Sequence, residues 1–302
     1  HTLSAYRAGS YFSEEMKRLD AISGIAYYEY IKDFAEHFDE RIAPFIHTCE
    51  RFAAQLFDKE RLLLWATCEK DQLSDVSEKL SEMVMKLDAK NADAASFKAE
   101  ELSLPEVLGK THQNEGIGTA SQVQYASLAG NFKQGGFAYH GALRVLRVIL
   151  NYDYFWLNIR VKGGAYGCMS NMSRNGNVLF SSFRDPNLSE TYEVFEHTPE
   201  YLANFDVSDR DMTKYVIGTI STMDTPLTPS QDGIRALTSY LTETTEAQLQ
   251  KDRDQVLACS QQDIRQLSEA IAYVLGEKHR CAIGNEEVIT SEHELFDEVR
   301  SL

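Results

Sequence analysis

The chain has 302 residues, of which 43% are hydrophobic and 25% are charged, a composition typical of a folded globular protein and not of a disordered one. Its 46 acidic residues outnumber 30 basic ones and give a net charge of −16, which argues against nucleic acid or an anionic membrane surface as the main partner. The apolar stretch 142–150 contains two arginines and is far shorter than the roughly 20 residues of a membrane span. We therefore expect no membrane segment.

The first part of the chain predicts helices, then one strand and one acidic helix. Apolar residues recur every three or four positions over 4–57, which predicts helices. The run 62–66 predicts a strand, and an apolar stripe over 73–87 predicts an amphipathic helix. Residues 91–117 turn polar, so we expect a linker there. On this reading residues 1–90 are the C-terminal part of a truncated first module.

Residues 118–302 predict a second, nearly complete module. A strand is expected over 122–126, and a densely apolar helix, buried on most sides, over 140–158. Asn175-Gly176 predicts a type I′ turn between strands 168–173 and 178–183. The remaining expected elements are a helix capped by Asp185-Pro186 and running to 205, helices over 209–223 and within 231–275 with a capping box at Ser260, a strand at 281–283, and an acidic helix from 291.

The two halves end alike, each with helices, a short apolar strand and an acidic helix. This weak internal repeat predicts an α+β fold whose first module has lost its beginning. The chain also starts at His1 without a leader, so we expect a fragment of a longer polypeptide. Five cysteines lack Cys-x-x-Cys spacing, which indicates reduced thiols in a cytosol or an organelle matrix.

Metal binding is the first chemistry to test, because His-x-x-Glu occurs three times. The pairs are His37 with Glu40, His112 with Glu115, and His197 with Glu200. None continues to a second histidine, so neither His-x-x-Glu-His nor His-Glu-x-x-His is present. Zinc needs three or four ligands held together, so we predict no metal site in this chain. The glycine spacings of phosphate-binding loops and the nucleophile elbow are also absent.

The segment from Arg160 to Gly167 is the strongest candidate for a working surface. Gly163 and Gly164 permit backbone angles closed to other residues and leave room for another chain. Arg160 and Tyr166 flank them with a guanidinium fork and a phenolic hydroxyl, which together can bind a carbonyl group. The alternative interpretation is a helix C-cap at the two glycines, with Tyr166 as an ordinary strand aromatic.

Several motifs that occur in order carry a family resemblance. They are Glu115-Gly116-Ile117, Gln122-Val123-Gln124-Tyr125, Gly141-Ala142-Leu143, Trp156-Leu157-Asn158-Ile159-Arg160, Gly163-Gly164-Ala165-Tyr166-Gly167 and Phe183-Arg184-Asp185-Pro186-Asn187. The chain resembles the C-terminal half of the presequence protease and falcilysin branch of the insulinase/pitrilysin zinc peptidases. Tyr11-Phe12 and residues 23–28 are similar to the end of that family's third domain. The resemblance implies tandem α+β modules, each an antiparallel-rich sheet covered by helices, in two halves that enclose a chamber.

The same resemblance implies a role for the glycine segment. Arg160 and Tyr166 would hold the substrate main chain and stabilise charge on the scissile carbonyl. Gly163 and Gly164 would let an extended peptide approach and pair with the strand 165–173. Zinc and its glutamate base would lie in an N-terminal half, so this chain would bind no zinc and would be inactive alone. The implied partners are unstructured peptides, among them basic targeting peptides, and that N-terminal catalytic half.

Two other functions fit the same residues. One is a non-catalytic structural or assembly homologue of the same fold. The other is a peptide-binding module that acts alone and without metal. A His-x-x-Glu-His motif elsewhere in the parent protein would favour the peptidase. We expect a bacterial cytosol as the compartment, with an organelle matrix as the alternative.

Overall fold

The computed structural model describes residues 1–56, 62–86 and 114–302. These residues form two compact units. The first contains 1–28, 114–225 and 246–302, and the second contains 29–56, 62–86 and 226–245. Most of the linker predicted over 91–117 lies outside the described residues, and its last four residues form the start of a strand.

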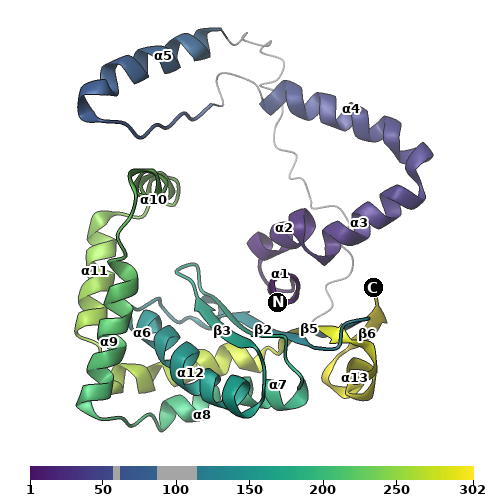
Figure 1. Ribbon diagram of the computed structural model, residues 1–302, viewed down its shortest axis with the longest axis vertical. Coiled ribbons are helices and arrows are strands. Elements are labelled where there is room, and N and C mark those ends of the chain that lie inside the picture. Colours follow the sequence, from purple (N-terminus) through teal and green to yellow (C-terminus); the bar gives the residue numbers. More distant parts are fainter. Residues whose placement is uncertain (57–61, 87–113) are drawn as a thin grey trace. The chain divides into compact units, whose positions relative to one another are not determined.

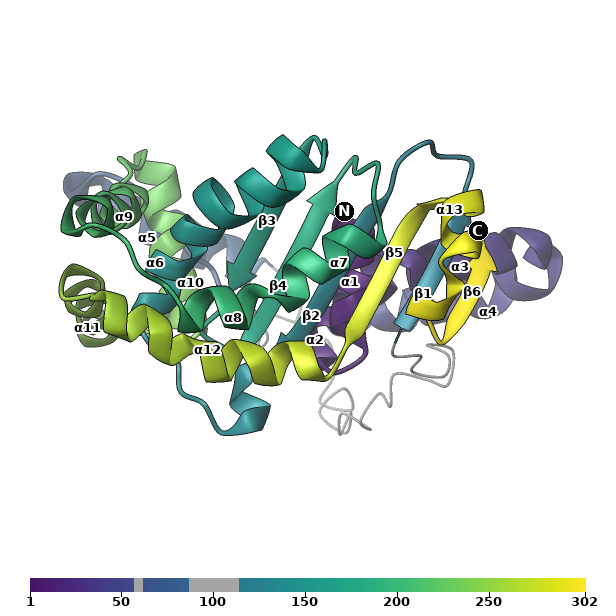
Figure 2. The same cartoon turned by 90° about the horizontal axis from the view of Figure 1, so that it is seen from below.

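The first unit is built on a mixed β-sheet. Within the described residues its strands are β1 (Asn114–Thr119), β2 (Tyr125–Asn131), β3 (Gly167–Met172), β4 (Asn177–Phe183), β5 (His279–Asn285) and β6 (Glu298–Ser301). Their order across the sheet is β3-β4-β2-β5-β1-β6 (Figures 1 and 2; all six strands are labelled in Figure 2). Strand β1 runs parallel to β5 and β6, and the other neighbours are antiparallel. The α+β fold class predicted from the sequence is confirmed.

Helices cover both faces of this sheet (Figures 1 and 2). Helices α1 (Thr2–Ser10) and α2 (Glu14–Ser23) lie on one side, and α6 (Ala142–Ile149), α7 (Ser189–Glu196) and α12 (Gln261–Gly276) lie on the other. Successive strand residues point to opposite faces, so Ala126 and Leu128 join the larger core under α6 and α12. Ala129 joins the smaller core under α1, beside Ser127, whose hydroxyl bonds the Ser4 hydroxyl at 2.9 Å.

A buried ionic cluster attaches α1 and α2 to β1. Arg7 binds both carboxylate oxygens of Glu115, with Nη2 2.9 Å from Oε1, and also bonds Asp20 Oδ2 at 3.1 Å. The Tyr11 hydroxyl donates to Glu115 at 2.6 Å. Because these contacts join residues more than 100 positions apart, residues 1–28 belong to the unit of the sheet, whereas the sequence placed them in a module with residues up to 90.

The helix predicted over 140–158 is a continuous helical run over 142–162 that widens as it proceeds. Helix α6 is followed by two π-helical segments, η6 (Leu150–Tyr154) and η7 (Trp156–Lys162). The predicted burial of this helix on most of its sides is found in α6 alone. Tyr152 and Val161 are exposed in the wider segments, because only one side of η6 and η7 packs against β3 and α7.

The predicted hairpin is confirmed as β3 and β4, but its turn differs. A type I′ turn needs positive φ at both central residues, and of Asn175 and Gly176 only Gly176 has it, at 102°. The Gly176 N–H donates to the Ser173 carbonyl at 3.0 Å, so a four-residue turn ends in a left-handed glycine. The longer turn accommodates Arg174, which binds the buried Asp252.

The C-terminal half of the first unit contains further helices and two corrections. Helices α8 (Thr198–Ala203), α9 (Asp209–Met223) and α11 (Glu246–Leu257) are present, and α12 begins with the predicted Ser260–Asp263 capping box. Asp185 does not cap α7, which begins at Ser189, because its carboxylate accepts hydrogen bonds from Asn187 N and Thr191 Oγ1 instead.

The prediction of an acidic helix that starts at residue 291 is wrong. Helix α13 (Glu286–Ser291) ends where that helix was to start, and η8 (His293–Leu295) leads into strand β6. Pairing with β1 includes this last segment in the sheet, and the first four residues of β1 lie in the predicted linker. Without a closing acidic helix, the repeat between the two halves loses one of its elements.

The regular secondary structure in the described residues of the second unit is helical. It contains most of α3 (Ile25–Glu36), with α4 (Phe38–Leu56), η2 (Lys70–Gln72), α5 (Leu73–Met85) and α10 (Pro229–Leu241). The predicted helix at 73–87 is confirmed as α5. The predicted strand at 62–66 is wrong, because a strand needs a neighbour to accept its backbone hydrogen bonds and no described residue pairs with this segment.

Candidate functional site

The end of the helical run turns sharply before β3, at the two glycines singled out in the sequence. The Gly163 N–H donates to the Asn158 carbonyl at 3.1 Å, and the Gly164 N–H to the Arg160 carbonyl at 3.0 Å. Gly164 has φ +82°, the left-handed conformation that usually ends a helix, and a Cβ atom there would meet only Pro186, at 3.6 Å. The C-cap interpretation is therefore correct, and it leaves an open backbone at Gly164.

Arg160 projects from the last turn of η7 and stacks on aromatic rings. Its guanidinium carbon lies 4.1 Å from the ring centroid of Trp156, one helical turn earlier, and 5.6 Å from that of Tyr166. A guanidinium on a ring face is attracted by the ring's quadrupole and keeps its N–H groups free at the edge. The structure thus brings Arg160 and Tyr166 together.

Tyr166 directly precedes β3 and is 63% exposed, so it is not an ordinary core aromatic. Its N–H donates to the Arg184 carbonyl at 3.2 Å, and its ring meets Phe183 edge to face with centroids 5.6 Å apart. The Arg184 guanidinium carbon lies 5.9 Å from the Tyr166 ring. The phenolic ring therefore has one arginine contact from η7 and one from the residue that follows β4.

The segment after β4 holds the glycine turn in place. Asn187 Nδ2 donates to the Gly163 carbonyl at 2.6 Å, while Asn187 N donates to the carboxylate of Asp185 at 3.0 Å. Burial raises the pKa of Asp185, and bonds from Thr191 and Asn187 oppose this only in part. Asp185 is fully buried and faces inward, so its role is to fix Asn187 and, through it, the glycine turn.

Strand β3 is an edge strand, yet its outer edge is occupied at Ser170. The Ser170 N–H and hydroxyl both donate to Asn151 Oδ1, at 2.6 and 2.9 Å, and Asn151 Nδ2 donates to the Ser170 carbonyl at 3.3 Å. The side-chain amide of Asn151 thus takes the place of a neighbouring strand at this residue. A peptide added along the whole of 165–173 would have to displace it.

Cys168 lies beside the site but is poorly suited to act as a nucleophile. Burial raises the pKa of its thiol to about 11, although the nearby Arg160 charge acts in the opposite direction. The thiolate is the reactive form of cysteine, and it is scarce near neutral pH at such a pKa.

The described residues of the His-x-x-Glu pairs lie apart and have other partners. His37 Nδ1 and His197 Nδ1 hydrogen-bond backbone carbonyls one turn earlier, and Glu115 belongs to the Arg7 cluster. His112 lies outside the described residues. Across the described ranges, no group of three or more His, Cys, Asp or Glu side chains is placed to hold a metal ion, so a zinc ion does not fit the residues present. No helix in these ranges is long and apolar enough to cross a membrane.

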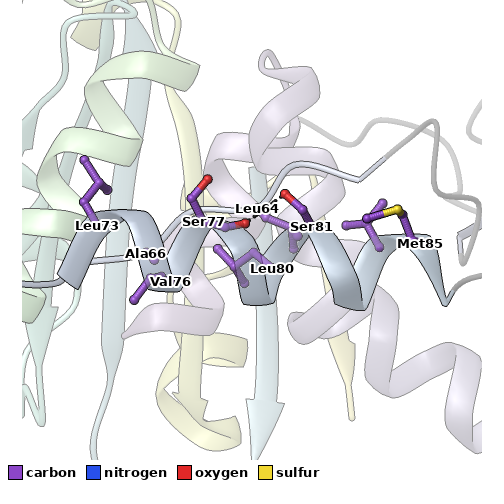
Figure 3. Close-up of a pocket in the computed structure, with 9 residues that line it drawn as sticks. Leu64, Ala66, Leu73, Val76, Ser77, Leu80, Ser81 and Met85 are labelled. Atoms are coloured by element: carbon purple, nitrogen blue, oxygen red, sulfur yellow. Dashed lines mark hydrogen bonds between the residues drawn. The ribbon is translucent and has the colours of Figure 1, made fainter.

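A separate pocket lies in the second unit, between α5 and the extended segment before it (Figure 3). It has a volume of about 530 Å³ and an apolar wall that includes Leu64, Leu80 and Met85. Its polar lining comes from Ser77 and Ser81, and the Ser81 hydroxyl bonds the Ser77 carbonyl at 2.8 Å. With no titratable residue in its lining, this pocket offers no groups for acid–base catalysis.

The sequence missed three contributors to the site: Trp156, Arg184 and Asn187. All three occur in the quoted motifs but were given no role. The spacing of Trp156 and Arg160 by four helical positions would have paired them. The hairpin register would have placed residue 184 near Tyr166. The bond from Asn187 to Gly163 joins two loops and leaves no periodic signal in the sequence.

Comparison with known proteins matches residues 114–289 to the family of PreP C-terminal domains. The protein HypA of Clostridium perfringens is 32% identical over the full length of this chain, and presequence protease 1, chloroplastic/mitochondrial, of Arabidopsis thaliana is 25% identical over 99% of it. The chain spans 30% and 27% of the lengths of these two relatives. Among solved structures, pitrilysin matches 89% of this chain with 31% of its own, at a TM-score of 0.41 and 14% identity.

Proposed function

Because the chain belongs to the family of PreP C-terminal domains, we propose that it is the substrate-binding part of a zinc-dependent metalloendopeptidase that degrades unstructured peptides in a closed chamber. Membership of this family confirms the resemblance carried by the sequence motifs. The zinc ion, its glutamate base and the attacking water belong to an N-terminal half of the same protein. This chain binds no zinc and is inactive alone.

The observation that carries the proposal is the meeting of Arg160 and Tyr166 at an exposed glycine turn. The guanidinium is stacked and the phenol is exposed, and no described carboxylate forms an ion pair with Arg160. Both groups donate hydrogen bonds and neither needs to move a proton. They are therefore suited to a substrate carbonyl that gains negative charge as water attacks it.

The glycines provide the approach for the substrate main chain. Gly164 carries no side chain and has open space beside it, so an extended peptide can lie close to residues 164–168. Asn151 occupies the edge of β3 at Ser170, and we expect main-chain pairing to stop before that residue. Because the N–H groups of Gly164, Ala165 and Tyr166 already donate to carbonyls of this chain, the side chains of Arg160 and Tyr166 are the main donors offered to that stretch of peptide.

The proposed compartment is a bacterial cytosol, with an organelle matrix as the alternative. All five cysteines are free thiols, which is usual for proteins kept under reducing conditions. The alternative function, a non-catalytic assembly homologue of the same fold, gives no reason for an unpaired arginine and an exposed tyrosine to meet at the glycine turn.

The test is Tyr166→Phe in the full-length polypeptide that contains this chain. Loss of one donor to a developing oxyanion lowers kcat by about 100-fold or more, while KM changes little because the hydroxyl acts mainly in the transition state. Tyr152→Phe is the matched control, since Tyr152 is an exposed tyrosine of the same helical run. An unchanged kcat in Tyr166→Phe, with an intact zinc site, would refute the role.

A further inference from the structure

Arg184 has a backbone conformation that its side chain does not favour. Its φ is +48°, and only two other non-glycine residues of the described chain, Glu243 and Lys278, have positive φ. Glycine or asparagine adopts this left-handed region at lower cost than arginine. The Arg184 side chain is exposed, so core packing does not explain why an arginine stands here. A strained residue without a packing role is a reason to look for function.

The Arg184 side chain lies over the proposed substrate site. Its guanidinium carbon is 5.6 Å from the Phe183 ring and 5.9 Å from the Tyr166 ring. The Arg160 guanidinium carbon is 5.6 Å from that same Tyr166 ring. Two arginines from different elements therefore converge on one exposed tyrosine.

Neither guanidinium is neutralised within the described residues. No ion pair joins Arg160 or Arg184 to a described carboxylate. The neighbouring Asp185 is buried and bonded to Thr191 and Asn187. Lys162, which bonds the amide of Asn158 at 3.1 Å, adds a third positive charge. In a chain of net charge −16, this local excess of unpaired cations is the opposite of the overall balance.

We propose that Arg184 is a second substrate-binding arginine and that, with Arg160, it binds a carboxylate group of the peptide beside Tyr166. Guanidinium groups match carboxylates in planar geometry and charge. A peptide presents a carboxylate either on an aspartate or glutamate side chain or at its C-terminus. This inference rests on the proposed peptidase function and adds to it a preference for negative charge near the cleaved bond.

The test compares matched peptides on the full-length polypeptide. One pair differs by glutamate or glutamine at a single position moved along the peptide, and a second pair ends in a free carboxylate or an amide. For the carboxylate-bearing peptides, Arg184→Gln should lower kcat/KM by about tenfold or more, since a charge-assisted hydrogen bond is lost. The neutral peptides should change less than about threefold. The two pairs distinguish a side-chain carboxylate from a terminal one.

Arg184→Gly separates function from folding. It removes the guanidinium and also the unfavourable φ, so the melting temperature should stay the same or rise while the preference for carboxylate peptides is lost. Lys278→Gly is the control, because Lys278 has φ +53° and should leave the preference intact. An equal loss of activity on charged and neutral peptides, or no loss on either, would overturn the carboxylate site.

Peptide binding, measured by fluorescence anisotropy of the labelled glutamate and glutamine peptides, keeps the two proposals apart. If the full-length protein cleaves no peptide but binds the glutamate peptide more tightly in an Arg184-dependent way, the peptidase proposal fails and the carboxylate site stands. If it cleaves both peptides equally in wild type and in Arg184→Gln, the peptidase proposal stands and the carboxylate site fails.

Discussion

Replacing Arg7 with methionine should lower the free energy of unfolding of the sheet unit by about 3–5 kcal/mol, the usual cost of removing one partner of a buried ion pair. Glu115 is 0% exposed and Asp20 only 2%, and Arg7 bonds both. Methionine fills similar space, so the loss of stability comes mainly from leaving the buried carboxylates of Glu115 and Asp20 without their arginine partner. Tyr11 and Arg300 remain near Glu115, at 2.6 and 3.5 Å, and keep the cost within this range.

The pH dependence of this effect has a definite sign. Burial alone would raise the pKa of Glu115, but the hydrogen bonds and charge of Arg7 outweigh it and hold that pKa below its ordinary value of 4.5. A lowered folded-state pKa contributes stability that is present above pH 4.5 and is lost as the pH falls through the lowered value. The difference between wild type and Arg7→Met should therefore shrink in acid.

Urea unfolding of this chain, followed by tryptophan fluorescence, measures the loss. In a Trp65→Phe background the remaining Trp156 reports on the unit that contains the sheet. Arg253→Met is the control: Arg253 forms an exposed two-bonded pair with Asp224, and such pairs contribute little. Adding Glu115→Leu to Arg7→Met should restore much of the stability. A loss below about 1 kcal/mol in Arg7→Met, the range of an exposed pair, would refute the stabilising role of the buried ionic cluster.

Two further predictions concern the glycine turn and its neighbouring thiol. Gly164→Ala should cost about 1–2 kcal/mol through its φ of +82°. Gly136→Ala, at φ +81°, should cost the same, so only a selective loss of kcat/KM in Gly164→Ala supports a substrate role. Cys168, with its pKa near 11, should have a thiolate fraction about 100-fold lower at pH 8 than an ordinary thiol of pKa 9, and iodoacetamide should alkylate it correspondingly slowly. Alkylation followed by mass spectrometry checks this, and equal rates in the folded and urea-unfolded chain would contradict it.

Local signals in the sequence predicted much of the fold. Caps and apolar periodicity placed α5, α9 and α12, because the hydrogen bonds and faces of a helix are formed by nearby residues. Asn175-Gly176 located the β3–β4 hairpin for the same reason, although it did not predict the turn type, in which Gly176 has positive φ and Asn175 does not.

Strand β1 could not be predicted from local signals in the sequence. Its sequence, Asn-Glu-Gly-Ile-Gly-Thr, has two glycines and a charge, which is typical of a loop. A Cβ atom on Gly116 would lie 2.7 Å from Ile289 and Phe296, so the glycine is needed for close packing by distant residues. Glu115 is compatible with a buried strand only because Arg7 neutralises it. Both partners are far away in the sequence.

The sequence singled out some of the residues that the structure groups at the candidate site. The spacing and residue types drew attention to Arg160, Gly163, Gly164 and Tyr166, and the structure brings them together at one turn. The side chains that hold these four residues in place could not be identified from the sequence. Asn187 bonds Gly163, and Asn151 bonds Ser170 at the edge of β3. These bonds join separate segments through side chains that show no pattern along the chain.

We propose that this chain supplies the substrate-binding surface and not the zinc chemistry. Zinc content and peptide cleavage, measured for this chain alone and mixed with the remainder of its polypeptide, test this proposal. We expect neither zinc nor cleavage with the chain alone, and both with the mixture. Zinc and cleavage by the chain alone would contradict it, as would a zinc-loaded mixture that cleaves no unstructured peptide.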